Sequence, residues 1–379
     1  MSFKALYQQK RMSAADAIRV VKNGDTIVVP TAVGEPPSLL TALSEARRDF
    51  RDVQISQILA VRKFGYLDPE TVENVRHTAY FYSGATRPGA KEGWVDFIPA
   101  YFSEMPQMIS RGLMPADVVF SMASPMDEHG FFSLALAADY TMAAIERARV
   151  VVLEVNPNVP FANGDCHIHI SQVAALCESD EPILEVGLPK IGPVQEAIGK
   201  YVAEMIPDGA TLQIGYGGIP DAVVMQLTDK RDLGIHTEMV GDGIMSLVEA
   251  GVVTNRKKNY HHGKMLATFA LGSKKLYQFM HRNPALDFVR AANRSNGGKA
   301  FIVLPSTAKD DTISRIVPTL SAGTHVSTSK NDINYVVTEF GVAQLRGKTA
   351  KQRTEALIGI AHPNFRGELR DAAKRLKLL

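Results

Sequence analysis

The chain has 379 residues, of which 45% are hydrophobic and 22% are charged, as in ordinary folded proteins and unlike disordered ones. Its 42 basic and 40 acidic side chains leave a net charge of +2, so no overall field favours a nucleic acid or an anionic membrane. Only two cysteines occur, Cys166 and Cys177, and no apolar run is long enough to span a bilayer. These features exclude a disulfide framework and a membrane span, and we expect a protein of the reducing cytoplasm.

Two stretches of the sequence repeat the same order of elements, one starting at Ala15 and the other at Lys200. Each predicts an amphipathic helix, a glycine that ends it, an apolar strand, a Gly/Pro loop, a second helix and a second strand. The paired features are Gly24 and Gly209, the strands at 26–29 and 211–214, and Asp52 and Asp232 at the start of the second strand. The order predicts an internal duplication, with chance similarity of two βαβ units as the alternative.

A further pair of apolar runs lies at 148–155 (ARVVVLEV) and 299–306 (KAFIVLPS). Both are short, which favours buried parallel strands over helices. Alternating strands and helices predict an α/β fold of two similar open α/β domains, each with a parallel-rich sheet flanked by helices. The Pro/Gly-rich stretch at 186–193 predicts a boundary between an N-terminal domain, 1–190, and a C-terminal domain, 191–379.

The two copies differ at one strand end. When the strands that begin DVQISQI and DLGIHTE are aligned, Ile58 corresponds to Glu238. Ligands of open α/β sheets bind at the carboxyl ends of the strands. A carboxylate that appears there in only one copy therefore indicates function, although a solvated glutamate is the simpler explanation.

The second copy also carries a glycine-rich loop, QIGYGGIP, between its first strand and its second helix. Its candidate binding residues are Gln213, Ile214, Gly215, Tyr216, Gly217 and Gly218. Glycines in this context let backbone N–H groups approach a phosphate or an oxyanion, but glycines in a tight turn look the same. A dinucleotide fingerprint would have a third glycine where this loop has Pro220, which disfavours a nicotinamide-dependent oxidoreductase.

Together with DLGIHTEM, SPMDEHGFFSL, LPSTAKDDTISRIVP and INYVVTEFGVAQLRGKT, this loop resembles the acetyl-CoA hydrolase and CoA-transferase family, which includes 4-hydroxybutyrate and butyrate CoA-transferases. The resemblance runs from about Ser13 to Phe365. It implies that Glu238 is a nucleophile that becomes a glutamyl-CoA thioester, and that the glycine-rich loop contacts CoA.

The resemblance implies a transferase that moves CoA between short-chain carboxylic acids by a ping-pong mechanism. Acyl-CoA and carboxylates would be its substrates, with no permanently bound cofactor, no metal, no nucleic-acid partner and no membrane. We also expect a homo-oligomer. A hydrolase that uses the same glutamate and a non-catalytic CoA-binding protein with an incomplete site remain as alternatives.

A glutamate suits this chemistry, because its attack on a thioester gives a mixed anhydride that CoA can attack in turn. Glutamate has a reference pKa of about 4.3 and is ionised at neutral pH without a dedicated base. The site must exclude water and must supply donors for the tetrahedral oxyanion, for which the amides of Gly217 and Gly218 are candidates.

The sequence departs from the family between Phe288 and Val289, where relatives carry several tens of residues more, including a GxGGQxDF-type loop that faces the thioester. The repeat indicates the same shortfall: Ile58 and Leu153 are 95 positions apart, whereas Glu238 and Leu304 are 66 apart, a difference of 29. Two explanations are open, a deletion in the protein itself or a stretch that this sequence leaves out.

Several other polar residues are expected to be structural. His167 and His169 alternate as in a strand, and satisfied histidines are the simpler interpretation than metal ligands. His236 would share a strand face with Glu238 and either tunes the site or has a structural role. The chain from Arg346 onward holds nine basic and three acidic residues, which favours a solvated basic surface, with CoA phosphate docking as the alternative.

Overall fold

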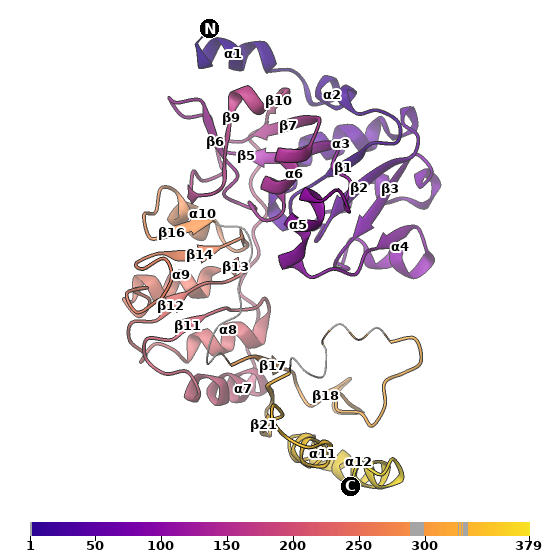
Figure 1. Cartoon of the computed structure of the whole chain (residues 1–379), viewed down its shortest axis with the longest axis vertical. Coiled ribbons are helices and arrows are strands. Elements are labelled where there is room, and N and C mark those ends of the chain that lie inside the picture. Colours follow the sequence, from indigo (N-terminus) through magenta and orange to yellow (C-terminus); the bar gives the residue numbers. More distant parts are fainter. Residues whose placement is uncertain (1, 289–298, 325, 327, 329–332) are drawn as a thin grey trace.

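A computed structural model of the chain describes residues 2–288, 299–324, 326, 328 and 333–379 (Figure 1). The first half builds one sheet of seven strands in the order β10-β7-β5-β1-β2-β3-β4. Its strands are β1 (Thr26–Val28), β2 (Val53–Gln57), β3 (Val75–Ala79), β4 (Val95–Phe97), β5 (Val118–Ala123), β7 (Val150–Val155) and β10 (Ala175–Glu178). Every neighbouring pair in it is parallel, as predicted.

Both faces of this sheet are covered, which explains why its central strands are continuous apolar runs. Val151 and Leu153 of β7 pack into one hydrophobic cluster, and Val152 between them packs into another on the opposite face. The helices of this half are α1 (Phe3–Lys10), α2 (Ala14–Ala17), α3 (Pro37–Glu45), α4 (Arg87–Glu92), α5 (Met105–Ser110) and α6 (Thr141–Arg147). Short 3₁₀ helices connect them: η1 (Ile18–Val20), η2 (Ala32–Gly34), η3 (Arg47–Asp49), η4 (Gly65–Leu67), η5 (Pro69–Thr71), η6 (Phe102–Glu104) and η7 (Ile170–Gln172).

The internal repeat is present in the backbone geometry. Gly24 and Gly209 both have positive φ, 81° and 75°, and Asp52 and Asp232 both have a φ of 56°. In each half the glycine N–H donates to the carbonyl of the residue before that aspartate, at 3.0 Å and 2.9 Å. Identical turns at matching positions support the duplication that the sequence predicts.

The second half spreads its strands over smaller sheets. They are β11 (Thr211–Leu212), β12 (Gly234–Ile235), β13 (Met239–Val240), β14 (Met265–Ala267), β15 (Phe269–Ala270), β16 (Leu286–Phe288), β17 (Phe301–Val303), β18 (Thr307–Ala308), β19 (Ile313–Ser314), β20 (Tyr335–Thr338) and β21 (Gly341–Gln344). β11 pairs with β12, a bridge between His236 and Leu266 continues toward β14, and β14 pairs with β16.

Three short strands belong to the first half of the chain but lie outside its main sheet. β6 (Phe131–Ser133) and β9 (His167–His169) form an antiparallel pair. β8 (Asn163–Gly164) pairs in parallel with β16 of the second half. The first half therefore contributes a strand to a sheet of the second half.

The strand at 299–306 is parallel to its neighbour, as predicted, but it is not buried. β17 pairs with β20, just as β7 pairs with β10. Ile302 of β17 is 37% exposed, whereas Val151 at the matching position of β7 is 4% exposed. The expectation of a buried strand is wrong here because, among the described residues, β17 has a strand on one side only.

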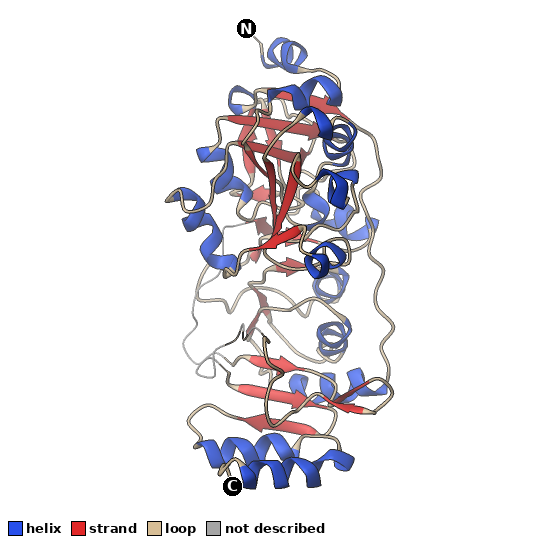
Figure 2. Ribbon diagram, turned by 90° about the vertical axis from the view of Figure 1, so that its right-hand side faces the viewer, coloured by secondary structure: helices blue, strands red, loops and turns tan. Residues whose placement is uncertain are grey.

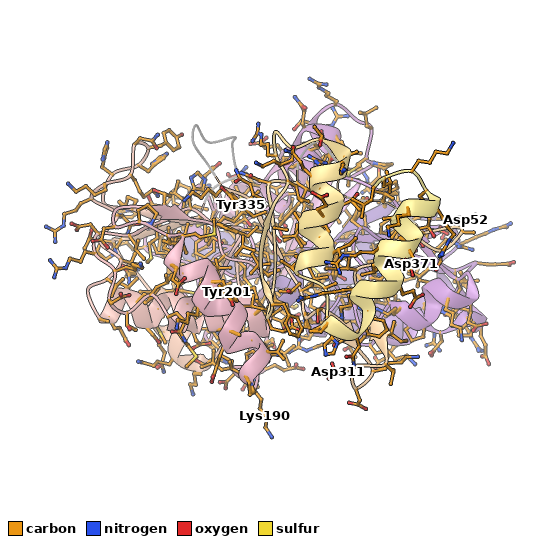
Figure 3. The ribbon with its side chains drawn as sticks, turned by 90° about the horizontal axis from the view of Figure 1, so that it is seen from below. Asp52, Lys190, Tyr201, Asp311, Tyr335 and Asp371 are labelled. Carbon is orange, nitrogen blue, oxygen red and sulfur yellow. The ribbon has the colours of Figure 1, made fainter. Side chains whose placement is uncertain are left out.

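Helices line the second half along the long axis of the molecule (Figure 2). They are α7 (Pro193–Glu204), α8 (Gly218–Met225), α9 (Asp242–Glu249), α10 (Lys274–Met280), α11 (Ala350–Gly359) and α12 (Arg366–Arg375), with the 3₁₀ helix η8 (Pro363–Phe365). Seen from below, α7 with Tyr201 lies on one side, and α11 with α12 and Asp371 on the other (Figure 3). No helix within the described ranges is long and apolar enough to cross a membrane.

Candidate active site

A cavity of about 280 Å³ lies between the two halves of the chain and contains Glu238 in its wall. The first half contributes Tyr101, Phe102, Ser103, Pro106, Asp139 and Tyr140. The second half contributes Gln213, His236, Thr237, Glu238 and Thr268. The predicted nucleophile therefore lies where the halves meet.

Backbone hydrogen bonds fix the position of Glu238, which lies between β12 and β13 and not, as the alignment predicted, at the end of a strand. Its carbonyl accepts the N–H groups of Thr268, at 3.0 Å, and Phe269, at 3.1 Å. The Thr268 hydroxyl donates to the same carbonyl at 2.7 Å. The backbone of the nucleophile is therefore held while its side chain faces the cavity.

The Glu238 carboxylate itself accepts no hydrogen bond from any side chain or amide in the described ranges. The side chain is open to solvent through the cavity, yet the surrounding protein partly desolvates it and raises the pKa of the carboxyl above its ordinary value. Because hydrogen bonds to a carboxylate lower its pKa and its reactivity, a carboxylate without them is suited to attack a carbonyl carbon.

Ile58 occupies the matching place in the first half. Its carbonyl accepts the N–H of Phe81 at 3.2 Å, as the carbonyl of Glu238 accepts that of Thr268. Its own N–H donates to the Tyr140 hydroxyl at 3.2 Å. The alignment of Ile58 with Glu238 agrees with the structure, and only the copy with the carboxylate lines the cavity.

The glycine-rich loop is attached to the segment of Glu238 through Thr237. The Ile214 N–H donates to the Thr237 hydroxyl at 3.0 Å, and that hydroxyl donates to the Ile214 carbonyl at 3.0 Å. Gly217, with φ 127°, precedes α8, a backbone conformation that side chains rarely adopt. Pro220 lies in the first turn of α8, as predicted for a helix start.

The loop residues do not all line one cavity, and Tyr216 borders two cavities besides the Glu238 cavity. Gln213 lines the Glu238 cavity. Tyr216 and Gly217 line a neighbouring cavity of about 110 Å³ together with Asp242. Gly218 and the other two loop residues do not line the Glu238 cavity. The side-chain amide of Gln213 is therefore better placed to meet an oxyanion than the amides of Gly217 and Gly218, and the binding role of the loop stays a prediction.

His236 lines the same cavity as Glu238, as its position two residues earlier suggested. Burial, followed by the nearby charges of Lys258 and His261, lowers the pKa of His236. The imidazole is therefore neutral at pH 7 and offers one donor and one acceptor.

His167 and His169 have hydrogen-bond partners of their own. A ring nitrogen of His167, Nε2, lies 2.8 Å from the Ala162 carbonyl oxygen, and Nδ1 of His169 lies 2.8 Å from the Ser171 hydroxyl. These contacts fit the structural role expected for both.

The first-half wall of the cavity was not predicted. Asp139 is buried, and its carboxylate accepts the N–H of Thr31 at 3.1 Å and the N–H and hydroxyl of Thr141 at 2.9 and 2.7 Å. Burial raises the pKa of Asp139 to about 6, although these bonds oppose the shift. Tyr140 donates its hydroxyl to the Val29 carbonyl. A charged residue directly after the apolar run LALAA was the only signal in the sequence.

Known proteins similar to this chain agree with the resemblance seen in its motifs. The models of the acetyl-CoA hydrolase/transferase N-terminal and C-terminal domains match residues 1–186 and 284–373. A succinyl-CoA:cyclohexane-1-carboxylate CoA transferase of Geobacter metallireducens is 43% identical, over 99% of this chain and 97% of its own length. A 4-hydroxybutyrate coenzyme A transferase of Clostridium kluyveri is 38% identical, over 99% and 100%.

Solved structures show the same fold. A 4-hydroxybutyrate CoA-transferase from Porphyromonas gingivalis superposes with a TM-score of 0.86 at 34% identity, covering 99% of this chain and 100% of its own. RipA from Yersinia pestis superposes with a TM-score of 0.93 at 31% identity, covering 100% of both. The chain therefore belongs to the acetyl-CoA hydrolase/transferase family.

Proposed function

We propose that this protein is a CoA-transferase that moves CoA between short-chain carboxylic acids, with Glu238 as the nucleophile. The observation that carries the proposal is a carboxylate without hydrogen bonds among the described residues, in a cavity between the two halves, at a position where the first half has an isoleucine. Relatives over 30% identical along nearly the whole chain are named CoA-transferases, which supports the activity.

In the proposed reaction, the Glu238 carboxylate attacks the thioester carbonyl, the carbon–sulfur bond breaks, and CoA leaves as a thiolate. The product is a mixed anhydride between the acyl group and Glu238. The thiolate then attacks the Glu238 carbonyl, which releases the first acid and leaves a glutamyl-CoA thioester. A second carboxylate reverses these two steps, so that CoA leaves on the new acid and the carboxylate is restored.

The cavity residues supply what this sequence of steps needs. The Gln213 amide and the neutral His236 line the cavity and can donate to the oxyanion, and losing such a donor typically costs about 3–4 kcal/mol of barrier. Tyr101 and Phe102 add aromatic surface to the cavity wall beside the reacting groups. CoA is a substrate here rather than a resident cofactor. We propose that the domains are 1–190 and 191–379, with the site at their junction.

The direct test is a search for the covalent intermediate. The protein is incubated with butyryl-CoA and digested, and the peptide that contains Glu238 is examined by mass spectrometry for bound CoA. We expect the adduct in the wild type and not in Glu238→Ala, which should also lose transfer. A melting curve for Glu238→Ala separates lost chemistry from lost folding. Unchanged turnover in this variant, with no adduct in the wild type, would rule the mechanism out.

A shorter carboxylate tests how closely the position matters. Glu238→Asp keeps the charge but withdraws it by one methylene, and a displacement near 1 Å can cost roughly 100-fold in rate. We expect kcat to fall by about that factor with little change in thermal stability. Glu45→Asp, on the exposed end of α3, is the matched control and should behave as wild type. Near-normal activity of Glu238→Asp would contradict tight positioning.

A hydrolase is the second candidate, because Glu238 is open to solvent and water could attack its anhydride or thioester. The two activities differ in their response to an acceptor acid. Loss of butyryl-CoA should accelerate with added acetate in a transferase and be indifferent to acetate in a hydrolase. We expect acceleration with formation of acetyl-CoA.

A further inference from the structure

We propose that Asp139 of the first half is a positioning residue for Glu238 of the second half, and that it acts through Thr268. The proposal rests on the proposed function, in which Glu238 is the nucleophile, and adds a residue on which the rate of that reaction depends. It follows from a series of hydrogen bonds that crosses from one half of the chain to the other.

Thr268 connects Glu238 to the first half. This residue lies between β14 and β15 and donates both its N–H and its hydroxyl to the Glu238 carbonyl. Its own carbonyl accepts the N–H groups of Ala138, at 3.1 Å, and Asp139, at 3.4 Å. One residue of the second half is therefore bonded to the nucleophile on one side and to the first half on the other.

Two further contacts extend this crossing into a short backbone pairing. The Leu136 carbonyl accepts the N–H of Ala270 at 3.0 Å. Ala137 and Phe269 form an antiparallel bridge. Because the two segments are paired along their backbones, a displacement of the first-half segment would displace its partner and the Glu238 backbone that is bonded to it.

The Asp139 carboxylate fixes the first-half segment in place. One oxygen, Oδ1, accepts the N–H of Thr141 at 2.9 Å and its hydroxyl at 2.7 Å. The other oxygen, Oδ2, accepts the N–H of Thr31, in the loop after β1, at 3.1 Å. The next residue, Tyr140, donates its hydroxyl to the Val29 carbonyl. The carboxylate therefore joins the start of α6 to the loop after β1.

This arrangement needs an acceptor on both sides of the Asp139 side chain. Asp139 is 2% exposed, and burying a carboxylate is costly unless hydrogen-bond donors compensate for the lost water. A bond to Thr141 alone would suffice to begin α6, so the start of the helix does not explain the bond to Thr31. An asparagine in this place would turn its NH₂ group toward one of these donors, and one of the two connections would be lost.

Glu154 provides a matched control for Asp139. It is a fully buried carboxylate of the first half that accepts the N–H groups of Ser38 and Leu39 and the Ser38 hydroxyl at the start of α3. It is not one of the described residues that line the Glu238 cavity. Asp139→Asn and Glu154→Gln each remove one buried charge at a helix start, so both should lower the melting temperature.

The two variants should differ in transfer from butyryl-CoA to acetate. We expect Asp139→Asn to lower kcat by about tenfold or more, because a displaced nucleophile reacts slowly, while KM for butyryl-CoA changes by less than about threefold. We expect Glu154→Gln to keep the kcat of wild type. Wild-type kcat in Asp139→Asn, or an equal loss of kcat in both variants, overturns the positioning role.

Substitutions of Thr268 test the route. Thr268→Val keeps the shape of the side chain but loses the hydroxyl that donates to the Glu238 carbonyl, whereas Thr268→Ser keeps a hydroxyl. We expect kcat to fall about tenfold in Thr268→Val and to stay within about threefold of wild type in Thr268→Ser. Asp139→Asn should then cost a smaller factor in the Thr268→Val background than in wild type. If the two factors simply multiply, Asp139 does not act through Thr268 and the proposal is wrong.

The CoA adduct separates failure of this proposal from failure of the proposed function. An adduct on Glu238 of the wild type, with wild-type kcat in Asp139→Asn, overturns the positioning role and leaves the proposed function standing. Absence of the adduct and of transfer in the wild type overturns both. If Asp139→Asn does not fold, Thr141→Val removes one donor from the same carboxylate and should lower kcat about threefold. Wild-type kcat in Thr141→Val then overturns the proposal.

Discussion

The two halves of the chain anchor the loop after their first strand in the same way and then use it differently. In the first half, the Gln57 side-chain amide donates to the Pro30 carbonyl at 3.0 Å. In the second, the Thr237 hydroxyl donates to the Ile214 carbonyl, also at 3.0 Å. The next residue along the chain is Ile58 in one half and Glu238 in the other. The same local backbone arrangement therefore holds a structural residue, Ile58, in the first half and the candidate nucleophile, Glu238, in the second.

The sheets of the two halves differ in completeness. In the first, β5 pairs with β1 on one side and β7 on the other. In the second, no described strand lies between β11 and β17, the counterparts of β1 and β7. Residues 98–149, 52 in number, separate β4 from β7, whereas only 12, at 289–300, separate β16 from β17.

The relatives also contain residues that have no counterpart in this chain. The alignment with the Geobacter transferase runs over 427 positions, 48 more than the 379 residues of this chain. At least 48 of those positions therefore have no counterpart here. The two sheets differ at the position of β5, the central strand of the first sheet. The second sheet therefore lacks a described counterpart of this strand.

Exchanging the residues at these two matching positions should have the largest effect. We expect Glu238→Ile to lose at least about 1,000-fold in transfer activity, as removal of a nucleophile does. Adding Ile58→Glu should restore none of it, because Ile58 does not line the cavity. Steady-state kinetics on both variants, with melting curves as a folding control, give the answer. Recovery of activity in the double variant would show that the halves are interchangeable.

Two matched substitutions, one in β7 and one just after β17, compare how much a buried leucine stabilises each strand. β7 has neighbouring strands on both sides, whereas β17 has a described neighbour on one side only. Leu153 is fully buried, and Leu153→Ala should cost about 3–4 kcal/mol of unfolding free energy. Leu304, at the matching position, is only half-buried, and Leu304→Ala should cost roughly 1 kcal/mol.

The chain's single tryptophan, Trp94, lies in the first half, so its fluorescence during urea unfolding reports Leu153→Ala. Hydrogen exchange of peptides around β17 and β20 reports Leu304→Ala. Equal losses at the two positions would mean that β17 is as well covered as β7.

The last contrast concerns the pH dependence of stability and the loop after β1. Glu35 is buried there, accepting from Gln57 and from the N–H groups of Val61 and Arg62. Burial raises the pKa of Glu35 to about 7, against hydrogen bonds that lower it. The folded protein therefore holds this proton more tightly than the unfolded chain. The stabilising contribution is full below about pH 4.5 and is lost as pH rises to about 7.

The loss should be at most about 3 kcal/mol between pH 4.5 and 7, because one pKa unit corresponds to about 1.4 kcal/mol. Urea unfolding at pH 5 and pH 8 should show a steeper fall in wild type than in Glu35→Gln. The exposed Glu45→Gln should match wild type. The glycine-rich loop of the second half contains no carboxylate, so we expect no such pH dependence from it. If the unfolding free energy changes with pH equally in wild type, Glu35→Gln and Glu45→Gln, Glu35 does not cause the pH dependence.

The sequence predicted well the features that depend on only a few neighbouring residues. Glycine and aspartate at fixed spacing predicted the turns at Gly24 and Asp52 and their counterparts, because few residues adopt positive φ. Apolar runs predicted the parallel strands of the first sheet. Aligning the copies placed Glu238 opposite Ile58, and the structure agrees.

The remaining features depend on contacts between distant segments. Tyr101, Phe102 and Asp139 reach the cavity only because the halves pack together, and no local pattern marks them. The exposure of β17 was missed because an apolar run does not reveal whether a neighbouring strand exists. The sequence predicted that the glycine-rich loop binds as one unit, yet its residues line several separate cavities.

Because β8 of the first half pairs with β16 of the second half, the second half can complete this sheet only when the first half is present. Asn163 and Gly164 supply the outer strand of a sheet whose other members come from the second half. At Gly164, with φ 106°, a Cβ would come within 2.3 Å of the Phe288 carbonyl oxygen, so only glycine fits this approach. The second half would expose the β16 edge to other chains if it folded alone. During synthesis, the first half emerges earlier and is already available to cover that edge.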